Sequence, residues 1–273
     1  MRDFTRQSVR EVPTARRPLP VSGILVGLRG FTGEEDLLLA EGRPEDPALA
    51  LNLVERLAWS RDRVDWAALC MLDIDSLIVR LRRAALGDRI IADVTCSNGE
   101  CRCRVDLSFG LNAYLAHHQP KRPGYIEPPQ GEPGWFVAEG KDGEKIDFRL
   151  PTIGEVVDLA DEPDPVESLA ALCLRPAAPP PRLRALAEKT MAALAPSLSG
   201  PIEGRCPQCG AAIAAHFDAR TYCLRELCDR ARFIYDDIDS LAERYHWSEQ
   251  EILSLPNERR LIYAERARQA RTL

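Results

Sequence analysis

Hydrophobic residues in the first hundred positions follow helical spacing before they switch to strand spacing. A short apolar run at 21–26 predicts a strand, and apolar residues three or four apart predict helices within 49–57 and 69–84. Alternating apolar residues at 90–94 and 103–109 predict the two strands of a hairpin. The pattern therefore predicts a mainly helical first half that ends in a β-hairpin.

A similar order returns in the second half. The proline-rich stretch at 119–134 predicts a linker without regular structure, and residues 135–137 predict a small hairpin with 146–148. Helical stretches follow, the last of them at 183–194, and the chain then reaches a second pair of cysteines in an alternating segment. We therefore expect a second half built like the first.

Each half also contains a threonine in the context of a helix start. Thr32 is followed three residues later by Glu35, and Thr152 by Glu155, which is the spacing of a capping box. The glycines around Thr32 have neither the spacing of a dinucleotide-binding fingerprint nor that of a phosphate-binding loop. These threonines therefore predict capped helices rather than a nucleotide site.

The last quarter of the chain contains the most regular apolar stripe. Its apolar residues keep to one helical face over about six turns, and acidic residues lie mainly outside that face. The stripe predicts one long helix with a solvated acidic side, followed by a short helix ending at Pro256 and a last helix from about Asn257. The apolar residues are Leu224, Leu227, Ala231, Ile234, Ile238, Leu241 and Tyr245, and the acidic ones are Asp229, Asp236, Asp237, Asp239 and Glu243.

Two cysteine pairs lie about a hundred residues apart. Cys96 and Cys101 form the first pair, and Cys206 and Cys209 form the second. Each pair supplies half of the four thiolates that a tetrahedral zinc ion needs. The simplest interpretation is one zinc ribbon built from two distant halves, with Zn²⁺ bound by all four cysteines.

The aromatic residues that follow the cysteine pairs strengthen this interpretation. Phe109 and Tyr114 stand eight and thirteen positions after the second cysteine of the first pair. Phe217 and Tyr222 stand at the same two offsets after the second pair. Equal offsets at two distant places are typical of an internal duplication.

These patterns together predict the organisation of the chain. We expect an α+β, mainly helical fold in which two degenerate repeated halves are joined by a zinc-ribbon-like pair of cysteine hairpins, with a C-terminal long-helix unit. The expected segments are a basic N-terminal arm at 1–17, a first helical half with its cysteine hairpin at 18–118, the linker at 119–134, a second half with its cysteine knuckle at 135–219, and C-terminal helices at 220–273.

Composition narrows the class of protein. The chain has 273 residues, of which 45% are hydrophobic and 29% charged, and this is ordinary for a globular protein. Its net charge of −6 argues against binding of a polyanion by the whole protein, although the first seventeen residues contain five arginines. No apolar run reaches the roughly 18 residues of a membrane span, and the start lacks the apolar stretch of a signal peptide, so a cytoplasmic protein is expected. In that compartment nine cysteines indicate metal ligands and buried thiols rather than disulfides.

The ligand set of the first hairpin stays open. Four residues separate Cys96 from Cys101, whereas two separate Cys206 from Cys209, and a further thiol at Cys103 is able to replace either ligand of the first pair. The second pair also has the spacing of a redox motif. A glycine and an alternating stretch follow it, however, rather than the helix start that a thioredoxin-like motif needs.

The remaining candidate residues favour structural roles, and no catalytic constellation is expected. Cysteines within helical stretches usually behave as buried apolar residues, histidines without a partner at a fixed offset are surface residues, and acidic clusters serve capping and solubility. The cysteines are Cys70, Cys173, Cys223 and Cys228, the histidines are His117, His118, His216 and His246, and the acidic clusters are Asp73/Asp75, Asp161/Glu162/Asp164 and Asp236/Asp237/Asp239.

A zinc-ribbon nucleic-acid-binding protein is the alternative function. It would need lysines and exposed aromatic residues around the two knuckles. Arg102, Arg104 and Arg205 are present there, but Glu100 and Glu203 balance them. The alternative therefore ranks below a structural role.

The order of several short motifs resembles a known family. They are Val26 to Asp36, Asp73 to Gly87 before the first knuckle, Phe148 to Thr152, Phe217–Asp218 after the second knuckle, and Tyr245 to Pro256. Over nearly the whole chain, their order resembles the baseplate hub and hub-assembly proteins of T-even-like contractile phages and of contractile injection systems. The resemblance implies a structural or chaperone-like assembly role in the tail baseplate, with the hub and spike proteins as partners. Together with the hydropathy, the charge balance and the lack of a catalytic constellation, it favours a protein without a membrane or small-molecule substrate and ranks nucleic-acid binding low. It also implies either residence in the producing cell or incorporation into the tail particle.

Overall fold

The computed structural model describes residues 15–127 and 132–271 of the chain. The fold mixes helices and strands, with 46% of residues helical and 21% in strands. This confirms the expected mixture, in which helix predominates. Within these residues, no helix combines the length and the apolar character that crossing a membrane requires. Most of the basic arm expected at 1–17 lies outside the described residues.

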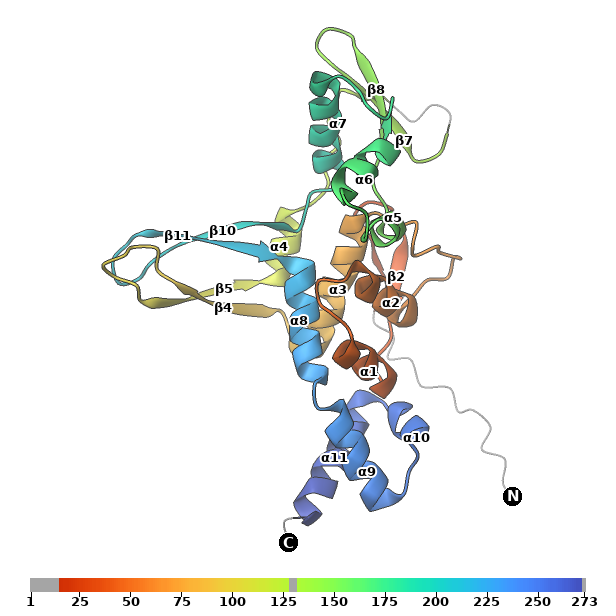
Figure 1. The fold of residues 1–273 in the computed structure, drawn as a ribbon, viewed down its shortest axis with the longest axis vertical. Helices are drawn as coiled ribbons and strands as arrows, with labels where there is room; N and C mark the ends of the chain where they lie inside the picture. The colour runs from red at the N-terminus through yellow and green to blue at the C-terminus, as the bar shows by residue number, and fades with distance from the viewer. Residues whose placement is uncertain (1–14, 128–131, 272–273) are drawn as a thin grey trace.

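Two stretches of the chain contain the same order of elements: a strand, two helices, a strand, a helix, a two-stranded hairpin and a helix (Figure 1). The first stretch consists of β2 (Leu25–Leu28), α1 (Gly33–Glu41), α2 (Pro47–Leu57), β3 (Ala58–Trp59), α3 (Met71–Leu86), β4 (Arg89–Thr95), β5 (Arg104–Gly110) and α4 (Leu111–His117). The second consists of β8 (Lys145–Arg149), α5 (Ile153–Asp158), α6 (Pro165–Cys173), β9 (Leu174–Arg175), α7 (Pro181–Leu194), β10 (Ser199–Arg205), β11 (Ala212–Asp218) and α8 (Ala219–Ala231).

The largest core is shared by both stretches. Apolar side chains of α1, α2 and α3 pack against those of α5 and α8, and α3 runs alongside α8. Leu53, Ile74 and Leu77 of the first stretch are fully buried, and so are Ile153 and Leu224 of the second. Each such side chain contributes about 1.5–3 kcal/mol relative to exposure. The two stretches therefore fold around one core. A short strand, β1 (Arg17–Pro18), and β3 flank β2 at the edge of this core.

A second, smaller core lies under a four-stranded antiparallel sheet at one end of the molecule (Figure 1). The predicted pairing of 135–137 with 146–148 is confirmed, because β7 (Trp135–Glu139) pairs with β8 and places Phe136 opposite Phe148. The proline-rich stretch, expected to lack regular structure, contributes the strand β6 (Ile126–Glu127), which pairs with β7. A strand between prolines is compatible with this position because β6 is an edge strand, which needs hydrogen bonds on one side only.

The prediction of a single long C-terminal helix from Leu224 to Tyr245 is wrong. The structure has two helices, α8 and α9 (Ile234–Tyr245), separated at Arg232 and Phe233. Each helix has its own apolar face: α8 belongs to the large core, and α9 packs with α10 (Glu249–Leu253) and α11 (Asn257–Arg271) around a separate small core. Neither glycine nor proline marks the break, so the helical spacing of apolar residues continues across it.

Candidate metal centre

Two β-hairpins deliver the cysteines to one place. In β4–β5 and in β10–β11 all seven residues of each strand are paired, and the two hairpins project together from the large core (Figure 1). Cys96 directly follows the last paired residue of β4, and Cys206 directly follows that of β10. Strand pairing therefore fixes both cysteines at the same level of their hairpins.

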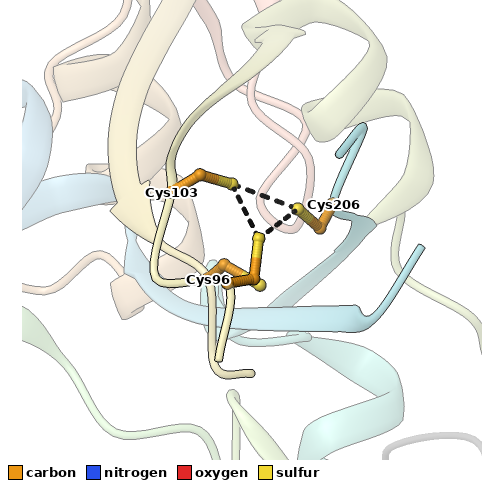
Figure 2. A group of neighbouring side chains, drawn as sticks. Cys96, Cys103 and Cys206 are labelled. Carbon is orange, nitrogen blue, oxygen red and sulfur yellow. Dashed lines mark hydrogen bonds between the residues drawn. The ribbon is translucent and has the colours of Figure 1, made fainter. Parts of the chain in front are cut away.

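Four thiols from the two hairpin tips form a compact group. The sulfur atoms of Cys96, Cys101, Cys103 and Cys206 all lie within 4.8 Å of one another. The Sγ of Cys103 lies 3.2 Å from that of Cys206 and 3.5 Å from that of Cys101, and the Sγ of Cys101 lies 3.9 Å from that of Cys206. Figure 2 shows Cys103 from the first hairpin pointing toward Cys206 from the second, with Cys96 close by.

These separations suit a tetrahedral metal site. Zinc–thiolate bonds of about 2.3 Å place the sulfur atoms of a tetrahedral site about 3.8 Å apart. A disulfide would instead require sulfur atoms about 2.05 Å apart, and all these cysteines are free thiols. The four thiols are therefore compatible with a bound metal ion.

The two hairpin tips share one backbone frame. The N–H of Cys96 donates to the carbonyl of Cys103, and the N–H of Cys206 donates to the carbonyl of Ala211, both at 2.9 Å. The residue before each of these carbonyls has a positive φ, 45° at Arg102 and 74° at Gly210. By this frame Cys101 corresponds to Cys209, and Cys103 takes the place of Ala211.

Cys209 is the fifth thiol of the centre. Of the four predicted ligands, the structure brings Cys96, Cys101 and Cys206 into the compact group, together with Cys103. Cys209 is exposed, and its Sγ lies 3.6 Å from that of Cys96. The centre thus holds one more thiol than a tetrahedral ion can bind.

Hydrogen bonding polarises these thiols. The backbone N–H of Cys209, helped by the thiol of Cys103, lowers the pKa of Cys206 to about 6. Hydrogen bonds with Cys206 and Cys101 raise the pKa of Cys103 to about 12. At neutral pH a thiolate at Cys206 thus accepts a hydrogen bond from the thiol of Cys103, and a metal ion bound by both would displace that proton.

An aromatic cluster joins the bases of the two hairpins. Phe217 makes edge contacts with Phe109 and Tyr114 at ring separations of 5.0 and 5.2 Å, and a tilted contact with Tyr222 at 5.3 Å. The hydroxyl of Tyr114 donates to the carbonyl of Leu198, and that of Tyr222 donates to the carbonyl of Ile91, each in the other half of the chain. The four aromatic residues at matched offsets therefore meet in one cluster.

The remaining cysteines and histidines lie outside the centre. Burial is the main cause that raises the pKa of Cys70 and Cys223 to about 12, and that of Cys173 and Cys228 to about 11. Within the described residues the metal-compatible group contains no histidine. The ring of His118 is held at the carbonyl of Tyr114, and His216 hydrogen-bonds Ser199.

One acidic residue that the helical pattern predicted on the solvated face is buried in ion pairs. Asp237, predicted on the solvated face, is 2% exposed and accepts hydrogen bonds from Arg260 and Arg268. Arg260 also binds Asp36, which ties α11 to α1. Helical spacing could not reveal this, because Asp and Arg occur equally on solvated faces.

Two carboxylates that the sequence assigned to helix capping, Asp73 and Asp75, also have tertiary partners. Asp73 accepts from the backbone N–H groups of Val21 and Ser22, so it positions the N-terminal segment rather than only capping α3. Burial raises the pKa of Asp75 to about 7, although Arg220 lies 3.5 Å away and opposes the shift. No sequence signal distinguishes these carboxylates from capping residues.

Comparisons with family models, with curated proteins and with solved structures find no match to this chain.

Proposed function

We propose that the two hairpins bind one Zn²⁺ and that this ion clamps the two halves of the chain together. The observation that carries the proposal is the compact group of four thiols, three from one hairpin and one from the other. Structural zinc sites are typically tetrahedral and made of four cysteine or histidine ligands. Such a site has no open position for a substrate, which supports a structural role.

Cys96, Cys101 and Cys206 are the constant ligands in this proposal, and the fourth place is taken by Cys103 or Cys209. Proximity favours Cys103, which lies 3.2 Å from Cys206. The shared backbone frame favours Cys209, which occupies the position that Cys101 has in the first hairpin. The two thiols can therefore substitute for each other.

A zinc ion at this place would act as a cross-link. There are 104 residues between Cys101 and Cys206. By analogy with a disulfide that closes a loop of this length, the restriction of the unfolded chain is worth about 4–5 kcal/mol. The ion would therefore supply a large part of the stability of a typical domain.

We further infer that the two stretches arose by internal duplication. The identical order of elements and the common backbone frame of the two hairpin tips support this. So does a repeated helix start: Arg149 and Thr152 bond Glu155, as Arg29 and Thr32 bond Glu35.

We propose that the protein is a structural or assembly protein of a contractile-tail baseplate hub, and that hub and spike proteins are its partners. Two of the motifs that carry the family resemblance, 26–36 and 148–152, lie at the helix starts by which parts of this chain join one another. The elongated arrangement of modules and the exposed large apolar side chains suit contacts with other proteins (Figure 1). Arg104 is paired with Asp93, so one of the arginines that the alternative of nucleic-acid binding would use has a carboxylate partner within the hairpin.

Co-expression with the hub and spike proteins of the same gene cluster tests this role. A stable complex that survives size-exclusion chromatography supports it. The proposal fails if no complex forms and the purified protein turns over a substrate. Mass spectrometry of purified particles then separates a permanent subunit, present in stoichiometric amount, from an assembly factor that leaves.

A further inference from the structure

Two segments of the chain form the same compact helix start. We call the segments 29–35 and 149–155 Thr clamps, because each has the pattern Arg-x-x-Thr-x-x-Glu with the threonine as the N-cap of a helix. In the second clamp, Arg149 and the N–H of Thr152 both donate to Glu155, at 2.9 and 3.0 Å. In the first, the equivalent donors bond Glu35 at 2.6 and 2.9 Å.

The second clamp docks on the loop that precedes α3. Thr152 forms an isolated antiparallel bridge with Cys70, the N-cap of α3. The N–H of Ile153 donates to the carbonyl of Leu69, and the N–H of Gly154 to that of Ala67, each at 2.9 Å. The helix that follows the clamp, α5, packs against α2, the helix that precedes this loop.

The first clamp also docks on a loop, the one that precedes α11, and shares the isolated bridge, although here the loop donates the hydrogen bond and the clamp accepts it. Thr32 forms an isolated antiparallel bridge with Pro256, and the N–H of Asn257 donates to the carbonyl of Phe31 at 3.0 Å. A Cβ on Gly33 would lie 2.7 Å from the Cα of Leu253, so the clamp approaches the backbone closely. Its helix, α1, packs against α10, which precedes this loop.

A third loop of this kind precedes α7, and among the described residues no Thr clamp is docked on it. Residues 177–181, Ala-Ala-Pro-Pro-Pro, lead into the first residue of α7 as residues 67–71, Ala-Ala-Leu-Cys-Met, lead into the first residue of α3. Leu69 and Cys70 are buried, whereas Ala177, Ala178 and Pro180 are exposed. In the part of the chain that the structure describes, the loop before α7 forms no bridge to a clamp. Proline does not prevent docking, since the loop before α3 contributes carbonyl acceptors to its clamp.

The helix before the open loop lacks the cover that α2 has. Five residues of α2 are buried, whereas in α6 only Cys173 is buried, although all residues of α6 except Glu167 and Ser168 are apolar. Val166 is 74% exposed and Leu172 is 47% exposed. An apolar helix exposed in this way is typical of a protein–protein contact.

We propose that the loop 177–181 and the outer side of α6 bind a Thr clamp of a partner protein: a strand ending in Arg-x-x-Thr-x-x-Glu followed by a helix whose apolar side covers Val166 and Leu172. The occupant is a different protein rather than a second copy, because both clamps of each copy are already docked within their own chain. The inference rests on the internal duplication proposed above.

The test uses the full-length chain and a fluorescein-labelled peptide of residues 143–160, which contains β8 and the second clamp. Saturable binding is expected, and Leu172→Glu weakens it at least about tenfold, equivalent to about 1.4 kcal/mol. The matched control is Leu261→Glu on α11, because Leu261 is 45% exposed and lies outside the proposed surface; it leaves binding unchanged. A peptide with Arg149→Ala and Glu155→Ala binds more weakly than the native peptide.

Three outcomes overturn the proposal. The first is that the native peptide shows no saturable binding up to about 1 mM. The second is that the peptide binds equally to the native protein, to Leu172→Glu and to Leu261→Glu. The third is that the bound peptide slows hydrogen exchange around residues 67–71 instead of around residues 172–182. A dimer of the native protein that Leu172→Glu abolishes would assign the surface to a second copy and also contradict it. Metal content, measured on the same samples, tests the zinc proposal independently.

Discussion

The first hairpin, β4–β5, places three thiols at its tip, whereas the second, β10–β11, places two. Their backbones are nevertheless alike, because the same hydrogen bond closes each tip and a positive φ precedes the same carbonyl. The first tip is longer by two residues between its first two cysteines and carries Cys103 where the second carries Ala211. The two hairpin tips thus share the same backbone hydrogen bond but differ in the number and positions of their cysteines. Cysteine spacing alone therefore does not define the ligand set.

Removal of a thiol tests this comparison with the largest expected effect. Cys206→Ser should abolish zinc retention and lower the free energy of unfolding by about 4–5 kcal/mol, because the zinc cross-link between the two halves is lost. Cys103→Ser and Cys209→Ser should each keep one equivalent of zinc, since each remaining thiol fills the fourth place. Metal analysis with urea denaturation measures both quantities. Zinc loss in either of the latter two variants would show that the two thiols are not interchangeable.

The aromatic cluster gives the next effect. Phe217 is 5% exposed and contacts the other three rings, whereas Phe109 is half-buried. Phe217→Ala should therefore cost about 3–5 kcal/mol, and Phe109→Ala should cost less. Hydrogen exchange should show that Phe217→Ala loosens α8 as well as the second hairpin. Full protection of α8 in this variant would mean that the hairpin and the helix are separate cooperative units.

The two Thr clamps predict a pH-dependent difference. Burial alone would raise the pKa of Glu35, but hydrogen bonds from Arg29 and Thr32 outweigh it and lower the pKa, and those from Arg149 and Thr152 do the same for Glu155. Stabilisation by either carboxylate is thus present at neutral pH and is lost as the pH falls below the ordinary value of 4.5 and through the lowered pKa.

We therefore expect Glu35→Gln to cost about 1–3 kcal/mol at pH 7. Glu155→Gln should cost less, because the side chain of Glu155 is 23% exposed and that of Glu35 is fully buried. Urea denaturation at pH 7 and near pH 3 measures both costs, and each should shrink at the lower pH. Equal costs at the two pH values would contradict a role for the ionised carboxylates.

The smallest effect concerns the two residues with positive φ at the hairpin tips. Gly210→Ala should destabilise the protein by about 1 kcal/mol, because a Cβ is unfavourable at φ 74°. Arg102→Gly, at φ 45°, should instead be neutral or slightly stabilising. Thermal unfolding of the zinc-loaded proteins measures the two shifts. A stabilising Gly210→Ala would show that the two tips do not share the frame described above.

Much of the fold near the metal centre could be predicted from the sequence. Strand alternation predicted the two hairpins. The equal offsets of Phe217 and Tyr222 indicated a duplication, although they did not predict that the four rings meet in one cluster. The spacing of Thr152 and Glu155 gave the capped helix directly, because a capping box is a local interaction.

Features that depend on tertiary contacts could not be predicted. The break between α8 and α9 leaves the apolar spacing intact, and only the presence of two separate cores reveals it. Asp237 has the same sequence context as a solvated carboxylate, yet Arg260 from a distant helix buries it. The inclusion of Cys103 in the thiol group likewise depends on how two remote hairpins meet.

The central claim is that one zinc ion is bound by thiolates of both hairpins. Zinc K-edge X-ray absorption on the freshly purified, reduced full-length protein tests it most directly, together with the zinc content of the same sample. The account predicts one zinc per chain with four sulfur ligands at about 2.3 Å. Less than half an equivalent of zinc, or a first shell containing nitrogen or oxygen, would contradict it.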